Sequence, residues 1–241
     1  MTELRAYDLF SCIGGHSLGL QRAGIQTVAF CEIDDWRRRV IAQNFPGIDI
    51  YDDVHSAPPI RADIYVGGPP CGGTSVAAAI QGARTGQTLW PQMLRLVSEG
   101  APAWVIVEQP PGNSEWEDKV ARSLEALGYR VQWADFKAAS LGLLCPRRRR
   151  YAIASRDAAR LALAWGSITS EVATRQRAAA ERNAGDVCVP RTLRVGDGFP
   201  ARVVGLTAQG SERVRRIRAI GDSNPPIMME VIGRAIVRAV A

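Results

Sequence analysis

The stretch VGGPPCGGTS, residues 66–75, holds Cys71 between a pair of prolines and a pair of glycines. Proline fixes the backbone torsion φ on the near side of the thiol, and glycine removes side-chain bulk on the far side. A thiol presented in this way can attack a bound substrate as a nucleophile. The alternative is a buried structural cysteine, which is common in protein cores. Because a core position rarely needs both flanking pairs, the pattern favours the nucleophile.

A carboxyl group occupies the matching place in AWVIVEQPPGN, residues 103–113. The apolar runs DIYVG, residues 63–67, and AWVIV each predict a β-strand. Cys71 and Glu108 would then lie at the ends of neighbouring strands, where they make a nucleophile and a proton donor. Glu108 alone fits a loop carboxylate, and its pairing with Cys71 is what favours the catalytic interpretation.

A glycine-rich turn follows the first predicted strand, AYDLF at residues 6–10. Gly14, Gly15 and Gly19 allow a ligand to approach the backbone closely between strand and helix. Roughly twenty residues later Glu32 ends the second predicted strand, where an acidic side chain can accept hydrogen bonds from ribose hydroxyls. This pairing predicts an adenosine-containing cofactor. The stretch GGHSLG is not the GxGxxG fingerprint, so a turn that serves only chain geometry is the alternative.

Strands and helices alternate along the chain in a way that would bring these residues together. Strands separated by helices predict a doubly wound, Rossmann-like, mostly parallel α/β sheet, whose ligands gather at the carboxyl ends of the strands. Asp53, after a presumed third strand, is a candidate acceptor for an exocyclic amine, with a capping or surface aspartate as the alternative. Strands are predicted at residues 6–10, 26–30, 63–67, 103–107, 130–136 and 150–155, and helices at 36–45, 89–100, 116–128, 170–182 and from Pro225 onward.

Composition narrows the class of protein. The 241 residues, 46% hydrophobic and 22% charged, suffice for one globular domain. The sequence has neither a membrane-spanning apolar run nor a signal-peptide pattern at its start, so a cytoplasmic protein is expected. The sequence has five scattered cysteines and two histidines, His16 and His55, and the histidines have no visible partners. This pattern predicts neither a disulfide framework nor a metal site. The net charge is +6, and arginine is concentrated between residues 147 and 218. This excess indicates a polyanionic partner or a solvated basic surface.

Six motifs, in order, resemble those of the cytosine-5 DNA methyltransferases that use S-adenosylmethionine. The resemblance covers residues 5–155 and about 215–240. A member of this family would act on double-stranded DNA in the cytoplasm of a bacterial or phage-infected cell, without membrane or metal, and its oligomeric state stays open, a monomer being one option. The motifs are the cofactor loop DLFSCIGGHSLGLQRAG, the ribose acid in CEID, the nucleophile loop GGPPCGGTS, the glutamate motif VEQPPGN, the arginine motif PRRRRYAIAS and the terminal helix AIGDSNPPIMMEVIGRAI.

The resemblance implies a role for each catalytic position. Cys71 would add to carbon 6 of a cytosine swung out of its duplex, and Pro70 would guide the ring. Glu108 would hold the proton at ring nitrogen 3. Arg148 and Arg150 would steady the base and its flanking phosphate.

The same resemblance implies a cofactor site. Phe10, Gly14 and Gly15 would wrap the methionine part of S-adenosylmethionine. Glu32 would hold the ribose, and Ile33 would pack on the adenine. The other implied cofactor residues are Asp53, at the adenine amine, and Asp8, Ser11, Val54, Gly68, Asp222 and Ser223.

The chain departs from the family pattern at several motif positions. Pro146 leaves the register within residues 147–150 open by one residue. Asp222 would repel an added carboxylate, so the ordinary methyl donor is expected rather than a carboxylated form of it. The departures are Cys12 for glycine, Gly72 for glutamine, Gln109 for asparagine, Pro146 for glutamine and Asp222 for a cofactor-side asparagine.

Residues 1–155 and 213–241 are predicted to form the catalytic and cofactor-binding domain, and residues 156–212 a small target-recognition region. A region this short reaches few base edges, which predicts a short or degenerate recognition sequence, or help from another subunit. Rival functions are a DNA-binding protein that has lost the chemistry, an RNA cytosine methyltransferase, and a nicotinamide dehydrogenase, which would have no use for Cys71 and Glu108. The candidate readers of the DNA are Arg175, Arg177, Arg182, Arg191, Arg194 and Arg202.

Overall fold

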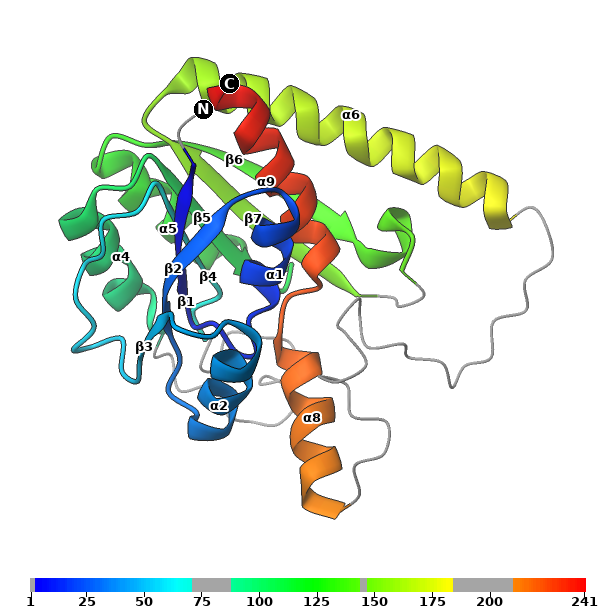
Figure 1. The fold of residues 1–241 in the computed structure, drawn as a ribbon. Helices are drawn as coiled ribbons and strands as arrows, with labels where there is room; N and C mark the ends of the chain where they lie inside the picture. The colour runs from blue at the N-terminus through cyan, green and yellow to red at the C-terminus, as the bar shows by residue number, and fades with distance from the viewer. Residues whose placement is uncertain (1–2, 71–87, 144–146, 184–209) are drawn as a thin grey trace.

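The structure, a computed structural model, describes residues 3–70, 88–143, 147–183 and 210–241. Within these residues the strands are β1 (Arg5–Leu9), β2 (Gln26–Cys31), β3 (Asp49–Tyr51), β4 (Ile64–Gly67), β5 (Trp104–Gln109), β6 (Arg130–Lys137) and β7 (Arg148–Ser155). They form one sheet in the order β3-β2-β1-β4-β5-β7-β6 (Figure 1). The predicted α/β class and the six predicted strands are confirmed, with ends that differ by one or two residues.

Helices cover both faces of this sheet. They are α1 (Gly15–Arg22), α2 (Asp35–Asn44), α4 (Trp90–Gly100), α5 (Ser114–Ala126), the short 3-10 helix η1 (Ala138–Leu141), α6 (Ala158–Asn183), α8 (Gly210–Asp222) and α9 (Pro226–Val240). One core layer joins the sheet to α1, α6 and α9, and a second joins the opposite face to α4 and α5. The chain therefore forms a three-layer, doubly wound domain.

Side chains alternate between these two layers along the central strands. In β4, Ile64 and Val66 belong to the layer under α9, whereas Tyr65 belongs to the layer under α4. In β5, Ile106 and Val107 divide in the same way. Because successive side chains of a strand point to opposite faces, continuous apolar runs such as IYV are what a strand covered on both sides requires.

The pairing of the strands is mostly parallel, as predicted, with β7 as the exception. The pairs β1–β2, β2–β3, β1–β4 and β4–β5 are parallel, and β7 is antiparallel to both β5 and β6. The connection between β6 and β7 spans residues 138–147, which is too short for a crossover helix. The chain therefore turns back, and β7 enters the sheet in the reverse direction.

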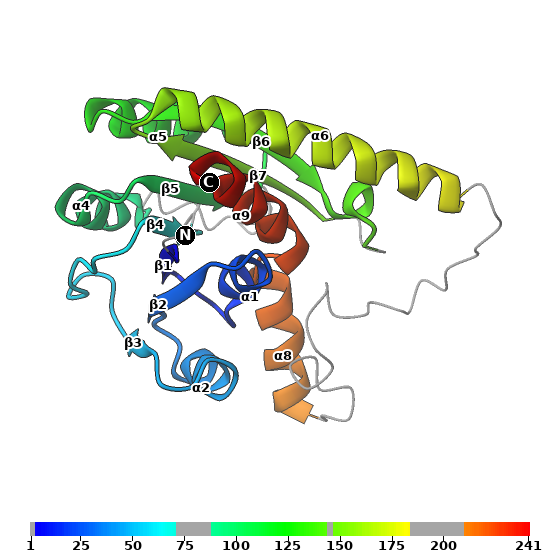
Figure 2. The same cartoon turned by 45° about the horizontal axis from the view of Figure 1, so that its top comes forward.

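The helix α6 is longer than the sequence indicated. A helical stretch was expected at residues 170–182, but the helix begins at Ala158 and has 26 residues. Leu161, Ala164 and Ile168 are buried against the core that includes α9, while the far end extends past the sheet (Figures 1 and 2). The beginning of the region predicted to read DNA thus packs as part of the main body. The boundary at residue 156 stays a prediction, and residues 184–209 lie outside the described part of the chain.

Asp8, at the end of β1, is fully buried and fixes the start of α1. Its carboxylate accepts hydrogen bonds from the Ser17 backbone N–H at 3.2 Å and the Ser17 hydroxyl at 2.7 Å. His16 Nδ1 lies 3.1 Å from the other carboxylate oxygen. Burial alone would lower the pKa of His16, but the charge of Asp8, its hydrogen bond to the ring and the charge of Glu108 together outweigh this effect, and the pKa is raised. The expectation that His16 has no partner is therefore wrong.

We expect Asp8→Ala to lower the free energy of unfolding by about 3–5 kcal/mol, because it leaves a buried histidine and the first turn of α1 without their acceptor. Urea titration followed by circular dichroism measures this change. Asp35→Ala is the matched control, since Asp35 forms exposed ion pairs with Arg38 and Arg39 that contribute little. Equal losses in the two variants would contradict the assigned role of Asp8.

Candidate functional site

The register of the sheet brings the carboxyl ends of four neighbouring strands to one level. Leu9 of β1 lies between Cys31 of β2 and Gly67 of β4, and Val107 of β5 lies beside Gly67. This edge includes the point between β1 and β4 at which the strand order reverses, where doubly wound sheets bind their ligands. The residues that come next on β2, β1, β4 and β5 are Glu32, Phe10, Gly68 and Glu108.

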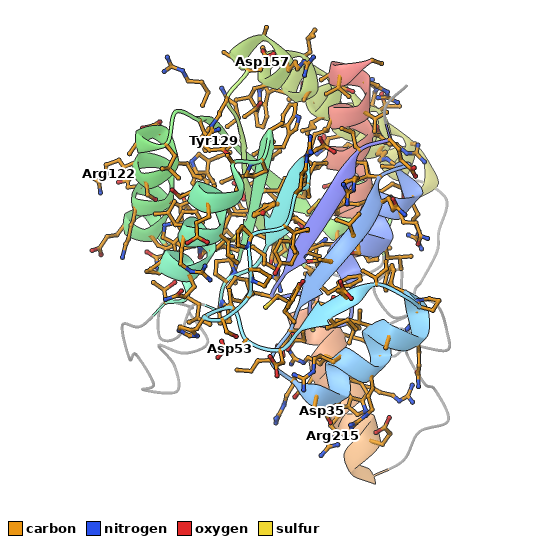
Figure 3. All side chains as sticks on the ribbon, turned by 60° about the vertical axis from the view of Figure 1, so that its left-hand side comes forward. Asp35, Asp53, Arg122, Tyr129, Asp157 and Arg215 are labelled. Atoms are coloured by element: carbon orange, nitrogen blue, oxygen red, sulfur yellow. The ribbon has the colours of Figure 1, made fainter. Side chains whose placement is uncertain are left out.

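A cavity of about 450 Å³ opens at this edge. Asp53 marks its position in Figure 3, at the carboxyl ends of the strands. Arg37, which the sequence did not single out, and Arg149, a residue of the arginine motif to which no role was assigned, also line it. The predicted site residues that line the cavity are Phe10, Glu32, Ile33, Asp53, Val54, Gly68, Pro70, Glu108 and Asp222.

Several predicted cofactor residues lie behind this wall instead. Asp8 and Ser11 support the loop after β1, and the Ser11 hydroxyl donates to the Asp8 carbonyl at 2.6 Å. Gly14 has a φ of 82°, and a Cβ added there would come within 2.6 Å of the Phe45 ring. Gly15 begins α1, and Ser223 is buried where the chain leaves α8. These five residues shape the loops around the cavity, although none of them lines it.

Glu32 presents a buried carboxylate to the cavity. Its two oxygens accept the backbone N–H groups of Cys12 at 2.7 Å and Asp34 at 2.9 Å. Burial raises the pKa of Glu32, and the two N–H groups oppose this shift. Each oxygen has a second lone pair, so the carboxylate can accept hydrogen bonds from the hydroxyls of a ribose. Ile33 follows with 76% of its surface exposed, a large apolar side chain suited to cover a flat base.

The backbone torsion at Cys12 explains why a glycine is favoured at this position. Its φ of 52° lies in the left-handed region, which costs a residue with a Cβ about 1 kcal/mol or more. The thiol lies 3.3 Å from the Ala219 carbonyl of α8, to which it donates a hydrogen bond. Burial raises the pKa of Cys12 to about 12, as it does for Cys31. Both thiols therefore stay protonated and unreactive near neutral pH.

Asp53 and Val54 follow β3 at the rim of the cavity. The Asp53 carboxylate accepts the backbone N–H of His55 at 2.9 Å and lies 2.8 Å from its ring Nδ1. The hydrogen bond from the backbone lowers the pKa of Asp53. The expectation that His55 has no partner is wrong, as it was for His16.

Glu108 lines the cavity together with the residues that precede Cys71 in the sequence. Cys71 and Gly72 lie outside the described residues, but Gly68 and the proline pair that leads to the cysteine line the cavity. Glu108 is only 8% exposed. A Cβ at Gly68 would come within 2.8 Å of Glu108 Oε2, so glycine leaves room for this carboxylate.

Arg149 is the arginine of the arginine motif that faces Glu108. Its Nε lies 2.5 Å from Glu108 Oε1 in an ion pair. A buried carboxylate held beside a cation at a cavity wall, with its second oxygen on the side of Gly68, can bind a polar group of a ligand.

Arg148 and Arg150 point to the opposite face of the sheet. Both bind Asp135, at 3.3 and 2.9 Å, and Arg150 Nε lies 2.9 Å from Glu117 Oε2. The Arg150 guanidinium also lies 5.2 Å from the Trp133 ring centroid. The placement gives no support to the roles predicted for Arg148 and Arg150, because alternate residues of β7 face opposite sides. Of these three arginines, Arg149 is the one that lines the cavity.

The predicted DNA readers lie away from the cavity or outside the described residues. Arg175 pairs with Glu171 at 3.0 Å on α6, and Arg177 is exposed on the same helix. Gln109 is buried at the end of β5. No helix in the described part of the chain is long and apolar enough to cross a membrane, and these residues hold no cluster of potential metal ligands. Pro146, Arg191, Arg194 and Arg202 are not among the described residues, and the side chain of Arg182 is not described.

Comparisons with known proteins agree with this geometry. The family model of C-5 cytosine-specific DNA methylase matches residues 4–190. Type II methyltransferase M2.BsuMI of Bacillus subtilis is 32% identical over 163 residues, 62% of this chain and 41% of that protein. Type II methyltransferase M.HgiBI of Herpetosiphon aurantiacus is 33% identical over 164 residues, 64% of this chain and 37% of that protein.

The solved structure of a candidate DNA modification methyltransferase encoded within an E. coli prophage is also similar. It superposes with a TM-score of 0.54 at 29% identity and covers 64% of this chain and 47% of that one. The chain thus spans less than half the length of each of these three proteins.

Proposed function

This chain belongs to the C-5 cytosine-specific DNA methylase family, and on this basis we propose that it transfers a methyl group from S-adenosylmethionine to carbon 5 of cytosine in double-stranded DNA. One observation carries the proposal. A single cavity is lined by Glu32, the proposed ribose acid, by the buried acid Glu108, and by the proline pair that precedes Cys71 in the sequence. A cytoplasmic location is part of the proposal.

The residues present fit S-adenosylmethionine. Glu32 would accept the ribose hydroxyls, Ile33 would cover the adenine, and Asp53 would accept its amine. Phe10 would contact the methionine part near the glycine loop. The bound donor would supply an electrophilic methyl group on a sulfonium.

The remaining chemistry falls to Cys71 and Glu108. The Cys71 thiolate adds to carbon 6 of the cytosine, and the electron pair released into the ring makes carbon 5 nucleophilic. Glu108 holds a proton at ring nitrogen 3, which neutralises the charge that addition would place on the ring. Carbon 5 would take the methyl group, with S-adenosylhomocysteine as the leaving group. Water or another base then removes the proton from carbon 5, and the electrons of that C–H bond re-form the double bond between carbons 5 and 6 as the thiolate leaves carbon 6. Arg149 brings positive charge to this end of the cavity, which favours the ionised thiol.

Access to the base requires that it leave the duplex. Extrusion of a paired base costs a few kcal/mol in stacking and pairing. The net charge of +6 supports phosphate contacts that can offset this cost.

Incubation with labelled S-adenosylmethionine and duplex DNA tests the proposal. Digestion and mass spectrometry should find the label in 5-methyldeoxycytidine. A parallel incubation with RNA of the same sequence distinguishes a DNA methyltransferase from an RNA methyltransferase. Label found in RNA and not in DNA would show that RNA is the substrate. Folded protein that binds DNA and transfers no label would support the rival that has lost the chemistry.

We expect Arg149→Met to lower kcat/KM by about 10- to 100-fold, since it removes a charged partner of Glu108. Arg148→Met is the matched control from the other face of β7 and is expected to change kcat/KM far less. Initial rates of methyl transfer to DNA measure both. A larger loss in Arg148→Met than in Arg149→Met would restore the roles that the sequence suggested.

We expect a short or degenerate recognition sequence. The stretch between β7 and α8 has room for few base contacts, each worth about 1–3 kcal/mol of discrimination. Bisulfite sequencing of DNA treated with the protein measures the sequence directly. Methylation confined to sites of about six or more fixed bases would contradict the expectation.

A further inference from the structure

Arg37 of α2 and Asp222, the last residue of α8, meet at the wall of the cavity. Arg37 Nη2 donates to Asp222 Oδ2 at 2.5 Å, although the two residues are 185 positions apart in the sequence. The two helices lie side by side beyond the carboxyl ends of the strands, and Asp35 of α2 and Arg215 of α8 mark this region in Figure 3. The Arg37 side chain is 22% exposed and that of Asp222 is 51% exposed, and both residues line the cavity.

The pair lies beside the groups that would hold the sugar and the methionine part of the donor. Burial would lower the pKa of Arg37, but Cys12, Asp222 and Glu32 outweigh it and the pKa is raised, so the guanidinium stays charged. Cys12 belongs to the loop after β1, and its N–H binds Glu32. Arg37 and Asp222 therefore place one positive and one negative charge next to the predicted ribose acid.

We infer that the Arg37–Asp222 ion pair recognises the zwitterionic amino-acid end of the methyl donor, an inference that rests on the proposed function. Arg37 would bind the α-carboxylate with its planar guanidinium, and Asp222 would accept from the α-ammonium group. A lone aspartate at position 222 would repel the α-carboxylate, whereas an asparagine would not. Arg37 compensates for the aspartate that replaces the asparagine of the resembled motif.

This pairing also changes the expectation about a carboxylated donor. That expectation relied on an uncompensated negative charge at Asp222. Because Arg37 offsets the charge, repulsion by Asp222 no longer argues against an added carboxylate.

The test compares two adenosine compounds by isothermal titration calorimetry. S-adenosylhomocysteine carries the amino-acid end without the reactive methyl group, and 5′-methylthioadenosine lacks that end. Arg37→Gln should weaken binding of S-adenosylhomocysteine by about 10- to 100-fold and that of methylthioadenosine by about twofold or less. Asp222→Asn should weaken it less, and the double variant should bind S-adenosylhomocysteine more tightly than Arg37→Gln, because no lone carboxylate remains.

Each other outcome overturns the inference in a different way. An equal loss for both compounds in Arg37→Gln would mean that the ion pair only holds α2 against α8, and binding of methylthioadenosine reports whether the variant is folded. Unchanged binding of both compounds would mean that the pair does not contact the ligand. Wild-type protein that binds neither compound would overturn the proposed function itself, and this inference with it.

Discussion

Replacement of Cys71 by serine is expected to reduce methyl transfer to duplex DNA by at least about 10⁴-fold. A serine hydroxyl stays protonated near neutral pH and is a much weaker nucleophile than a thiolate, so carbon 6 receives no addition and carbon 5 stays inert. Initial rates with labelled S-adenosylmethionine measure the loss. The two described cysteines, Cys12 and Cys31, are buried thiols with a pKa of about 12, so neither is a substitute nucleophile.

The control for this variant is binding. Cys71→Ser should keep its affinity for S-adenosylhomocysteine, because the cofactor residues on β1 and β2 are unchanged. Cys188→Ser, which removes a different thiol, should methylate at a rate close to that of the wild type. Full activity in Cys71→Ser would show that Cys71 is not the nucleophile.

Replacement of Glu108 by glutamine is expected to lower the rate by about 10²- to 10⁴-fold. Glutamine keeps the shape of the side chain but has no acidic proton to hold at ring nitrogen 3. The change also leaves Arg149, whose side chain is 17% exposed, without the carboxylate that lies 2.5 Å from its Nε. Single-turnover rates at saturating donor and DNA isolate this step from binding.

Glu117→Gln is the matched control for Glu108→Gln. Glu117 is also a carboxylate paired with an arginine, Arg150, at 2.9 Å, but on the other face of the sheet. We expect its loss to change the rate little. Similar rate losses in both variants would show that the effect comes from the loss of a carboxylate paired with an arginine of β7. A proton held at the base would then not be the cause.

Much of the fold follows from the sequence because the central strands are covered on both faces. Runs such as IYV and WVIV have no polar side to expose, and the segments between them have helical periodicity. The reversed direction of β7 depends on the length of one connection. The start of α6 went unrecognised, although Leu161, Ala164 and Ile168 are spaced as one face of a helix. Short alanine side chains between them weaken the contrast on which such patterns depend.

The placement of a residue at the cavity was predictable where a motif fixes that residue at a strand end, as for Glu32 and Glu108. It was not predictable where a single residue of register decides the face of the sheet, as for Arg149 against Arg148 and Arg150. Contacts between residues distant in sequence could not be predicted either. The partner of Arg37, for example, lies on α8 and comes near only in the folded chain. A local contact, that of Asp8 with His16, escaped because both are buried and no pattern pairs them.

Covalent capture of the base tests the central claim most directly. A duplex that carries 5-fluorocytosine at the mapped target allows addition at carbon 6 and methyl transfer to carbon 5, but fluorine cannot leave as the proton does, so the thiol is not released. Incubation with S-adenosylmethionine should yield one protein joined to one DNA strand, with the link on the peptide that contains Cys71. Methylation of ordinary DNA without such an adduct, or an adduct on another residue, would contradict the account.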